Sequence, residues 1–196
     1  MAFDPEIIQR WIKPQSRVLD LGCGDGSVLK ALADKLGVDG YGLEIDQIKI
    51  ASCIEKGVSV IEQDLDRGLA NFPDGSFDTV VMTQTLQAVR YPHLVLKEML
   101  RIGKECIITF PNFAHWSCRL YLGGRGRMPI SRVLPYTWYD TPNIHFCTVI
   151  DFEALCRDMN ICILNRMVVD EKNQATLAAR ILPNLFGVTA IYHISH

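Results

Sequence analysis

The stretch that most constrains the fold is Arg17-Val-Leu-Asp-Leu-Gly-Cys-Gly-Asp-Gly-Ser27, an apolar run that breaks into three glycines. The segment after it, from Val28 to Leu36, has helical spacing. Glycines let the backbone adopt positive φ and let a ligand approach the main chain closely. The free N–H groups at a helix start favour polar or anionic ligand groups. The stretch therefore predicts a strand, a tight loop and a helix that form a site for a nucleotide-like cofactor.

Strand-like apolar runs alternate with segments of helical spacing over the first 110 residues. Such alternation is typical of a doubly wound α/β sheet whose neighbouring strands are parallel. After the glycine loop, strands are predicted at Val38 to Ile45, Val58 to Glu62, Asp78 to Thr83 and Cys106 to Phe110, with helices at Asp46 to Lys56 and Tyr91 to Ile102.

The two ends of the chain add a helix and an edge pair of strands. A short helix is predicted over residues 4–13, opened by Asp4 and stopped by Pro14. Near the other end, a helix over Asp151 to Arg157 is capped by Thr148 or Asp151. Two antiparallel edge strands are then predicted, at Ile161 to Val169 and Gly187 to Ile194.

Composition restricts the class of protein. With 196 residues, 48% apolar and 21% charged, the chain fits one soluble globular domain over residues 1–196. A net charge of −2 gives no general reason to expect nucleic acid or an anionic membrane as a partner. No apolar run approaches the roughly 20 residues that span a bilayer, and the N-terminus does not resemble a secretory signal. Seven scattered cysteines without a Cys-x-x-Cys pair argue against disulfides and a metal site, so we expect a reduced, cytoplasmic protein.

Three acidic residues narrow the choice of cofactor. Asp20 lies inside the first strand, whereas the nicotinamide fingerprint usually has no acid just before its glycines. An acceptor there suits a ligand with a positively charged amine, such as the amino acid end of S-adenosylmethionine. Glu44 follows at about the distance where an acid bonds ribose hydroxyls, and Asp64 ends the third strand, where it could receive the adenine amino group. Open α/β sheets bind ligands at this carboxyl edge.

This combination resembles the class I S-adenosylmethionine-dependent methyltransferases over residues 15 to about 110, with Asp20 and the three glycines matching motif I. The resemblance implies a Rossmann-like fold with a seven-stranded, mostly parallel sheet in the order 3-2-1-4-5-7-6 and helices on both faces. The cofactor would be S-adenosylmethionine or S-adenosylhomocysteine. The candidate cofactor residues are Asp20, Gly22, Cys23, Gly24, Gly26, Glu44, Ile45, Asp64, Leu65 and Thr83.

Further stretches are more specific than motif I. They are Gln63-Asp-Leu-Asp66, Thr83-Gln-Thr-Leu-Gln87, Phe110-Pro-Asn-Phe-Ala-His-Trp116 and Trp138-Tyr-Asp-Thr-Pro-Asn-Ile-His145. With the glycine loop, they look like the methionine biosynthesis protein MetW family over nearly the whole chain. That family is associated with homoserine O-acyltransferase. The resemblance implies a partner or activator of this acyltransferase that retains the methyltransferase fold and that S-adenosylmethionine could regulate.

Residues 113–147 differ in character and are predicted to be an insertion over the carboxyl edge of the sheet. They contain prolines, aromatic residues and a basic, glycine-broken turn, Gly123-Gly-Arg-Gly-Arg127. The aromatic and polar residues could line a substrate pocket, face the acyltransferase or simply pack together, and the arginines could form a mobile loop or a docking element. The candidates for a substrate or partner surface are Arg125, Arg127, Trp138, Tyr139, Asn143 and His145.

Methyl-transfer chemistry is not clearly indicated. At the end of the fourth strand, Thr83-Gln-Thr-Leu86 replaces the Asn/Asp-Pro-Pro-aromatic tetrad of amide and nucleobase N-methyltransferases. His115 and His145 are the only plausible general bases near the carboxyl edge, although a packed or surface histidine is the favoured interpretation of each. An acyltransferase partner that binds S-adenosylmethionine is therefore our first hypothesis. A small-molecule methyltransferase is the second, and a nicotinamide dehydrogenase is disfavoured by Asp20.

Overall fold

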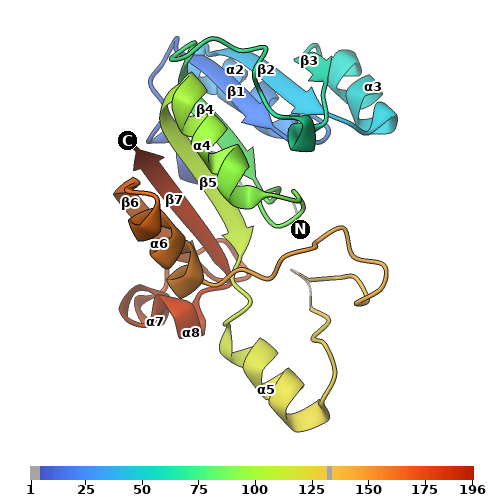
Figure 1. Cartoon of the computed structure of the whole chain (residues 1–196), viewed down its shortest axis with the longest axis vertical. Coiled ribbons are helices and arrows are strands. Elements are labelled where there is room, and N and C mark those ends of the chain that lie inside the picture. Colours follow the sequence, from blue (N-terminus) through green and yellow to red (C-terminus); the bar gives the residue numbers. More distant parts are fainter. Residues whose placement is uncertain (1–4, 132–133) are drawn as a thin grey trace.

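The fold is a seven-stranded sheet with helices on both faces, as the computed structural model shows for residues 5–131 and 134–196 (Figure 1). The strand order is β3-β2-β1-β4-β5-β7-β6, which confirms the predicted order. The strands are β1 (Arg17–Leu21), β2 (Asp39–Glu44), β3 (Ser59–Glu62), β4 (Phe77–Thr83), β5 (Gly103–Pro111), β6 (Cys162–Val169) and β7 (Thr189–Ser195).

The sheet is parallel from β3 to β5 and antiparallel at the other side. β1 pairs in parallel with both β2 and β4, where Asp20 lies opposite Gly42 and Val81. β7 runs antiparallel to β5 and to β6, so β7 is an inner strand and β6 is the edge. Because the chain reverses strand order at β1 and β4, the carboxyl ends of these two strands mark the crevice where such sheets bind ligands.

The helices vary from one turn to three, and the longer ones cover the sheet. They are α1 (Glu6–Gln9), α2 (Ser27–Leu36), α3 (Gln47–Glu55), the 3₁₀ turn η1 (Leu65–Arg67), α4 (Pro92–Ile102), α5 (Trp116–Arg125), α6 (Val149–Asp158), α7 (Leu177–Ile181) and α8 (Pro183–Phe186). Figure 1 shows α4 and α6 in front of the sheet and α2 behind it.

Two apolar cores follow from the alternation of side chains along the strands. Leu19 of β1 belongs to the core under α4 and α6, while its neighbour Val18 belongs to the core on the face of α1 and α2. Ile108 and Ile107 of β5 divide in the same way. Because successive strand side chains point to opposite faces, near-continuous apolar strands are required when helices cover both faces.

Helix caps place the starts of α3 and α6. The Asp46 carboxylate accepts the Ile48 N–H at the start of α3. The Thr148 hydroxyl accepts the Asp151 N–H, so Thr148 is the cap of α6 and Asp151 lies in the first turn. Both arrangements satisfy N–H groups that have no partner within the helix.

The predicted turn over Gly123 to Arg127 was wrong, because Gly123 and Gly124 lie inside α5. The ring of His115 caps this helix by accepting the Ser117 N–H. The helix ends at Gly126, whose φ of 61° is in the left-handed region and whose N–H donates to the Leu122 carbonyl. The cap and this terminal bond offset the cost of about 1 kcal/mol for each internal glycine.

Both ends of the chain also differ from expectation. The helix predicted over 4–13 is regular only over α1, after which single turns continue to Ile12, and its predicted opening residue Asp4 lies outside the described residues. The short helices α7 and α8 were not predicted. Among the described residues, no helix is long and apolar enough to cross a bilayer.

Candidate functional site

A cavity of about 520 Å³ opens at the carboxyl ends of β1, β2 and β4. This volume lies within the range of small-molecule sites. Its walls combine the glycine loop, the end of β2, the segment after β3, the segment after β4 and part of the 113–147 insertion. The lining residues are Gly22, Leu43, Glu44, Ile45, Lys49, Gln63, Asp64, Leu65, Asp66, Gln84, Thr85, Ala88, Val89, Pro142 and Asn143.

Gly22 brings bare backbone to the cavity wall. Its φ is 72°, and its N–H donates to the Leu43 carbonyl at 2.8 Å, which joins the loop to β2. A Cβ at this position would lie 2.6 Å from side-chain atoms of Thr85. Both the backbone conformation and the close approach of Thr85 therefore require glycine.

The Glu44 carboxylate holds the loop and the end of β2 together. Glu44 is only 6% exposed. One carboxylate oxygen accepts the Gly24 N–H at 2.9 Å, and the other accepts the N–H groups of Ile45 and Asp46 at 2.9 and 3.1 Å. Glu44 thus orders two walls of the cavity while it lines the cavity itself.

Asp20 is a buried carboxylate without a partner. Its exposure is 0%, and neither carboxylate oxygen has a hydrogen-bond partner among the described residues. Burial, and secondarily the nearby Glu44 carboxylate, raises the pKa of Asp20 to about 7. Asp20 lies two residues before Gly22 of the cavity wall, so a cationic group entering from the cavity would supply the missing partner.

The cavity is acidic, because Glu44, Asp64 and Asp66 line it against the single lysine Lys49. This balance suits a cationic ligand and disfavours a pyrophosphate. S-adenosylmethionine carries a sulfonium and an ammonium group together with ribose hydroxyls. The orphaned Asp20 oxygens and this acidic lining fit that group. No set of three His, Cys, Asp or Glu residues in the described part of the chain is placed to hold a metal ion.

The candidate cofactor residues divide between the cavity wall and its support. Gly22, Glu44, Ile45, Asp64 and Leu65 line the cavity. The others lie behind it: Asp20, Cys23, Gly24, Gly26 and Thr83 do not line it. Cys23 is buried, with its sulfur 3.9 Å from that of Cys53, and the pKa of its thiol is raised by burial.

The segment after β4 contributes wall residues that sequence reasoning did not select. Gln84 adopts a φ of 54° and donates two hydrogen bonds to the Thr109 hydroxyl, from its backbone N–H and its side-chain amide. The Thr85 hydroxyl donates to the Thr83 carbonyl at 3.0 Å. The sequence signal for these residues is the stretch Thr83 to Gln87, whose position after the fourth strand places it at the carboxyl edge of the sheet.

The insertion returns across the cavity in a short segment that we call the return limb, residues 141–147. Pro142 and Asn143 of this limb line the cavity. The next two backbone N–H groups, of Ile144 and His145, both donate to the Gln87 carbonyl, at 2.9 and 3.0 Å. The limb therefore forms an outer wall that is fixed to the segment after β4.

Neither candidate base lines the cavity. The His115 ring lies 2.7 Å from the Ser117 hydroxyl and caps α5, and burial lowers its pKa. The His145 ring bonds the Arg90 carbonyl at 3.2 Å. Both rings are thus engaged in holding the insertion.

The remaining surface candidates are exposed side chains outside the cavity lining. Trp138 and Tyr139 are 74% and 75% exposed and form an edge-to-face pair with ring centres 5.6 Å apart. Arg125 is the last residue of α5, with its guanidinium 4.9 Å from the centre of the Tyr121 ring, and Arg127 is exposed beyond the helix. Asn143 alone of this group reaches the cavity.

The sheet order and the helices on both faces define the class as a Rossmann-like class I methyltransferase fold. The chain is similar to an S-adenosylmethionine-dependent methyltransferase from Mesorhizobium loti, with a TM-score of 0.70 and 17% identity over 97% of this chain and 96% of that one. It is also similar to a chain in the complex between the Haloferax volcanii Trm112 methyltransferase activator and a methyltransferase, with a TM-score of 0.68 and 18% identity over 94% and 85% of the two chains.

The family follows from the sequence comparison. Residues 2–194 match the family model of the methionine biosynthesis protein MetW, so the chain belongs to the MetW family. It is 36% identical over 197 residues to a bifunctional methionine biosynthesis protein MetXA/MetW from Rhodopirellula baltica. The match covers 96% of this chain but 32% of that protein, so this chain spans about a third of the length of that relative.

Proposed function

We propose that this chain binds S-adenosylmethionine and acts as a partner and activator of homoserine O-acyltransferase in methionine biosynthesis. The observation that carries the partner role is the Rhodopirellula baltica relative, whose name joins MetXA and MetW in one polypeptide. We take its MetXA portion to be the acyltransferase. Two activities joined in one chain are held at a high effective concentration, which favours a direct physical partnership between them.

Ligand binding is supported by the chemistry of the cavity. The ammonium of S-adenosylmethionine would pair with Asp20, whose buried carboxylate has no hydrogen-bond partner in the part of the chain that the structure describes. The ribose hydroxyls would lie near Glu44 and the adenine near Asp64 and Ile45, all of which line the cavity. Leu65 lines the cavity beside Asp64, and the supporting residues are Cys23, Gly24, Gly26 and Thr83. S-adenosylhomocysteine lacks the sulfonium charge but keeps the ammonium, so it should compete for the same site.

An accessory role fits the chemistry better than methyl transfer by a general base. Neither His115 nor His145 lines the cavity, and both rings bond groups of the insertion or of its contact with the sheet. A methyl acceptor that must lose a proton would therefore need a base brought by another molecule. The alternative is a small-molecule methyltransferase, which would show product from labelled cofactor in a metabolite extract, lost in Asp20→Ala and His145→Ala.

The return limb offers a route from ligand to partner. Pro142 and Asn143 touch the cavity, and Trp138 and Tyr139 lie shortly before them on an exposed surface. A ligand that fixes the limb would change the free energy of partner binding, and the partner would change ligand affinity by the same factor. Calorimetric titration of S-adenosylmethionine with and without the acyltransferase tests this regulation. Identical affinities would remove it.

We further infer that residues 1–196 act as one methyltransferase-like domain, with 113–147 as its insertion, in the reducing cytoplasm. The cytoplasmic location is supported by seven free cysteines. The decisive test of the partner role is homoserine acyl transfer by the cognate acyltransferase, measured with and without this protein. We expect a higher rate and co-elution of the two chains. An unchanged rate without co-elution would refute the partner role.

A further inference from the structure

The insertion exposes large apolar side chains away from the cavity. They lie on α5, on the segment after it and on the return limb. The largest are Trp116, Leu120, Tyr136, Trp138, Tyr139 and Phe146, with exposed fractions from 45% to 75%. Exposed apolar side chains in such number mark interaction sites, and tryptophan and tyrosine dominate the binding energy at such sites. We call this surface the aromatic–arginine face, with Arg119, Arg125 and Arg127 as its described cations.

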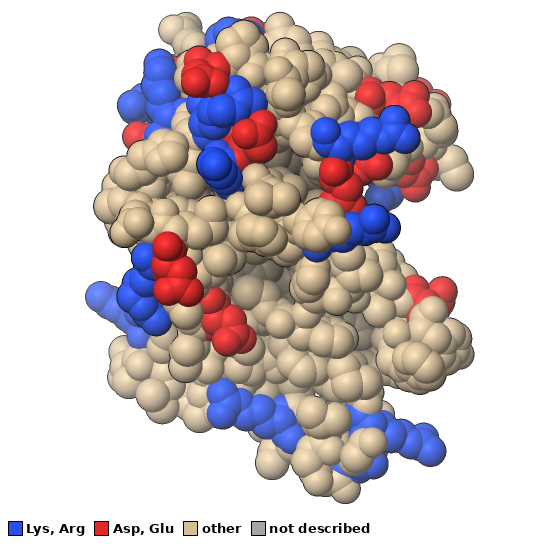
Figure 2. Space-filling view, in the orientation of Figure 1, with Lys and Arg blue, Asp and Glu red and all other residues tan. Residues whose placement is uncertain are grey.

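The charge of this face is opposite to that of the rest of the chain. Residues 113–147 contain four arginines and one acid, Asp140, which gives a net charge of +3. Because the whole chain carries −2, the remainder carries −5. No ion pair joins Arg119, Arg125 or Arg127 to a carboxylate in the described part of the chain, although lysines of the body are paired, as in Lys30–Asp34 and Lys104–Asp78. Figure 2 shows blue atoms without red ones beside them at the end of the molecule that carries α5.

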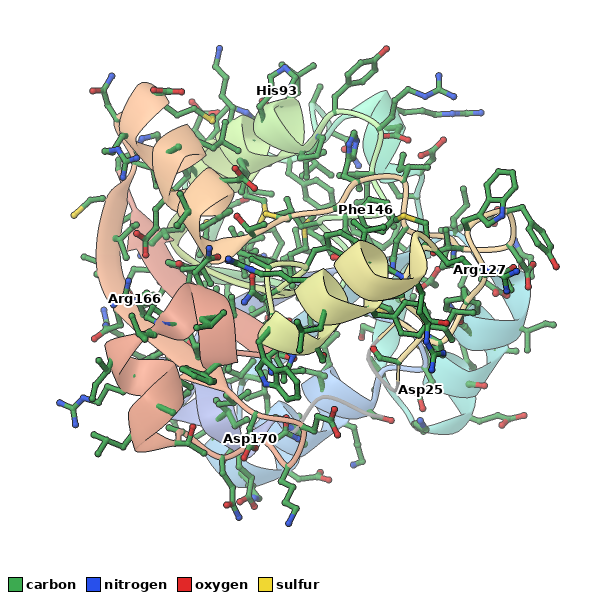
Figure 3. The ribbon with its side chains drawn as sticks, turned by 90° about the horizontal axis from the view of Figure 1, so that it is seen from below. Asp25, His93, Arg127, Phe146, Arg166 and Asp170 are labelled. Atoms are coloured by element: carbon green, nitrogen blue, oxygen red, sulfur yellow. The ribbon has the colours of Figure 1, made fainter. Side chains whose placement is uncertain are left out.

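The face is held in place by contacts at its base. The Asn112 side chain donates to the carbonyls of Asn184 and Gly187 at 3.1 and 2.8 Å, and its oxygen accepts the Ala114 N–H at 3.2 Å. The Phe113 ring lies 4.4 Å from that of Phe146, which joins the outgoing chain to the return limb. Figure 3 shows Arg127 just past one end of α5. A surface fixed in this way loses little conformational entropy when it binds.

We propose that the aromatic–arginine face is the docking surface for homoserine O-acyltransferase and that it meets an apolar recess rimmed by carboxylates on that enzyme. This inference rests on the proposed function. Charge supports this choice of partner, because unpaired arginines around aromatic side chains favour a partner surface with an acidic rim around an apolar centre. The Rhodopirellula baltica relative also supports this choice, because its name joins MetXA and MetW in one polypeptide. The 35-residue insertion is large enough for the 20–30 residues that a standard interface takes from each side.

The test measures binding of purified variants to the cognate acyltransferase by calorimetry. Trp138→Ala should raise the Kd about 30-fold, as expected for a central aromatic residue. Its control is Ile48→Ala on α3, since Ile48 is equally exposed at 79% and lies outside the face. Arg127→Glu should raise the Kd about tenfold and weaken its salt dependence, whereas the same change at the exposed Arg157 of α6 should alter the Kd less than threefold.

Two further readouts separate the causes of a negative result. Each variant must keep the melting temperature and S-adenosylmethionine affinity of the unmutated chain, which shows that it is folded. If the unmutated chain neither binds nor stimulates the acyltransferase, the proposed function itself fails. If it binds and stimulates but Trp138→Ala and Arg127→Glu bind equally well, the docking surface is elsewhere and only this inference fails.

Other occupants of the face would also overturn it. Sedimentation of the chain alone would reveal a homodimer that Trp138→Ala disrupts, which would assign the face to a second copy. Vesicles that contain phosphatidylserine, mixed with the chain at physiological salt, would reveal binding that Arg127→Glu abolishes and would assign it to a membrane. We expect no vesicle binding, because the rest of the chain carries −5 and would be repelled by an anionic surface. We expect no homodimer through this face, because a two-fold contact would bring its own arginines together.

Discussion

The candidate cofactor region around β1 to β4 and the insertion of residues 113–147 contain unpaired charges of opposite sign. In the first, the buried carboxylate of Asp20 has no hydrogen-bond partner among the described residues, and burial raises its pKa. In the second, Arg119, Arg125 and Arg127 are exposed and form no ion pair within the described part of the chain. In neither region does the described part of the chain supply these groups with a partner of opposite charge. The difference lies in accessibility: Asp20 is fully buried behind a cavity of small-molecule size, whereas the arginines are exposed on the surface.

The two regions also differ in how their structure is maintained. The cofactor region is part of the sheet, and strand pairing and two apolar cores fix it. The insertion depends on a few specific bonds, chiefly those of the Asn112 side chain and of the Gln87 carbonyl. A small change at one of these bonds should therefore disturb the insertion without unfolding the sheet. Substitutions and titrations in each region test these contrasts.

The largest effect is expected from Asp20→Asn, which keeps the shape of the side chain but removes its charge. S-adenosylmethionine affinity should fall at least about 100-fold, because the ligand ammonium loses its buried partner. Calorimetry measures this loss. Asp25→Asn is the matched control, since Asp25 lies in the same loop but is exposed and paired with Lys56; it should change affinity less than about threefold. Undiminished binding by Asp20→Asn would show that the buried acid does not select the ligand.

Without ligand, the same variant should be the more stable one at alkaline pH. The folded-state pKa of Asp20, about 7, exceeds its ordinary value of 3.8, so the folded state binds more protons than the unfolded state between these values. This group therefore lowers stability as pH rises from about 4 to about 7, by up to about 1.4 kcal/mol per unit. The advantage of Asp20→Asn in urea unfolding should grow over that window and level off above it.

The second prediction concerns Asn112, which links the sheet to the insertion. Asn112→Ala should cost about 2 kcal/mol of unfolding free energy, because it leaves buried carbonyl and N–H groups without partners. Trypsin should also cut the native variant faster after Arg125 or Arg127. Asn165→Ala, which removes one partly buried bond between side chains, to His193, is the control and should cost about 1 kcal/mol at most. Equal proteolysis of Asn112→Ala and the parent chain would contradict this linking role.

The third prediction is a pH dependence of ligand affinity. An ammonium ligand binds the ionised carboxylate, so affinity should rise about tenfold between pH 6 and pH 8 and flatten above, given the raised pKa of Asp20. Binding at pH 6 should release close to one proton, which calorimetry in buffers of different ionisation enthalpy detects. The weak residual binding of Asp20→Asn should lack this slope. A flat profile for the unmutated chain would place the ammonium elsewhere.

The sheet was predictable because its determinants are local. The apolar run of β1 and the alternation of strands with helices are visible in short windows, and the class resemblance supplied the strand order. The positions of Glu44 and Asp64 at the cavity follow from the same rule, since parallel strands end at one edge. The role of each side chain was harder to predict. Three backbone N–H groups donate to the Glu44 carboxylate, and no spacing in the sequence indicates these bonds.

The insertion could not be predicted in this way because its structure depends on distant contacts. The Gln87 carbonyl bonds residues more than 50 positions away, and Pro142 reaches the cavity only through those bonds. Gly123 and Gly124 indicated a turn by local propensity, yet His115 and Gly126 cap a helix that contains them. Where a few capping and long-range bonds decide the structure, propensity is a weak guide.

The smallest expected effect is on stability, when an arginine is removed from the face. Arg127→Ala should change the free energy of unfolding by less than about 0.3 kcal/mol, because no ion pair to Arg127 exists in the described part of the chain. Lys30→Ala, which breaks an exposed pair with Asp34 one helical turn away, should cost about 0.5 kcal/mol. Urea unfolding at low salt resolves this difference. If Arg127→Ala lowers the free energy of unfolding as much as Lys30→Ala does, this arginine stabilises the fold. Its exposure would then no longer support a role in binding a partner.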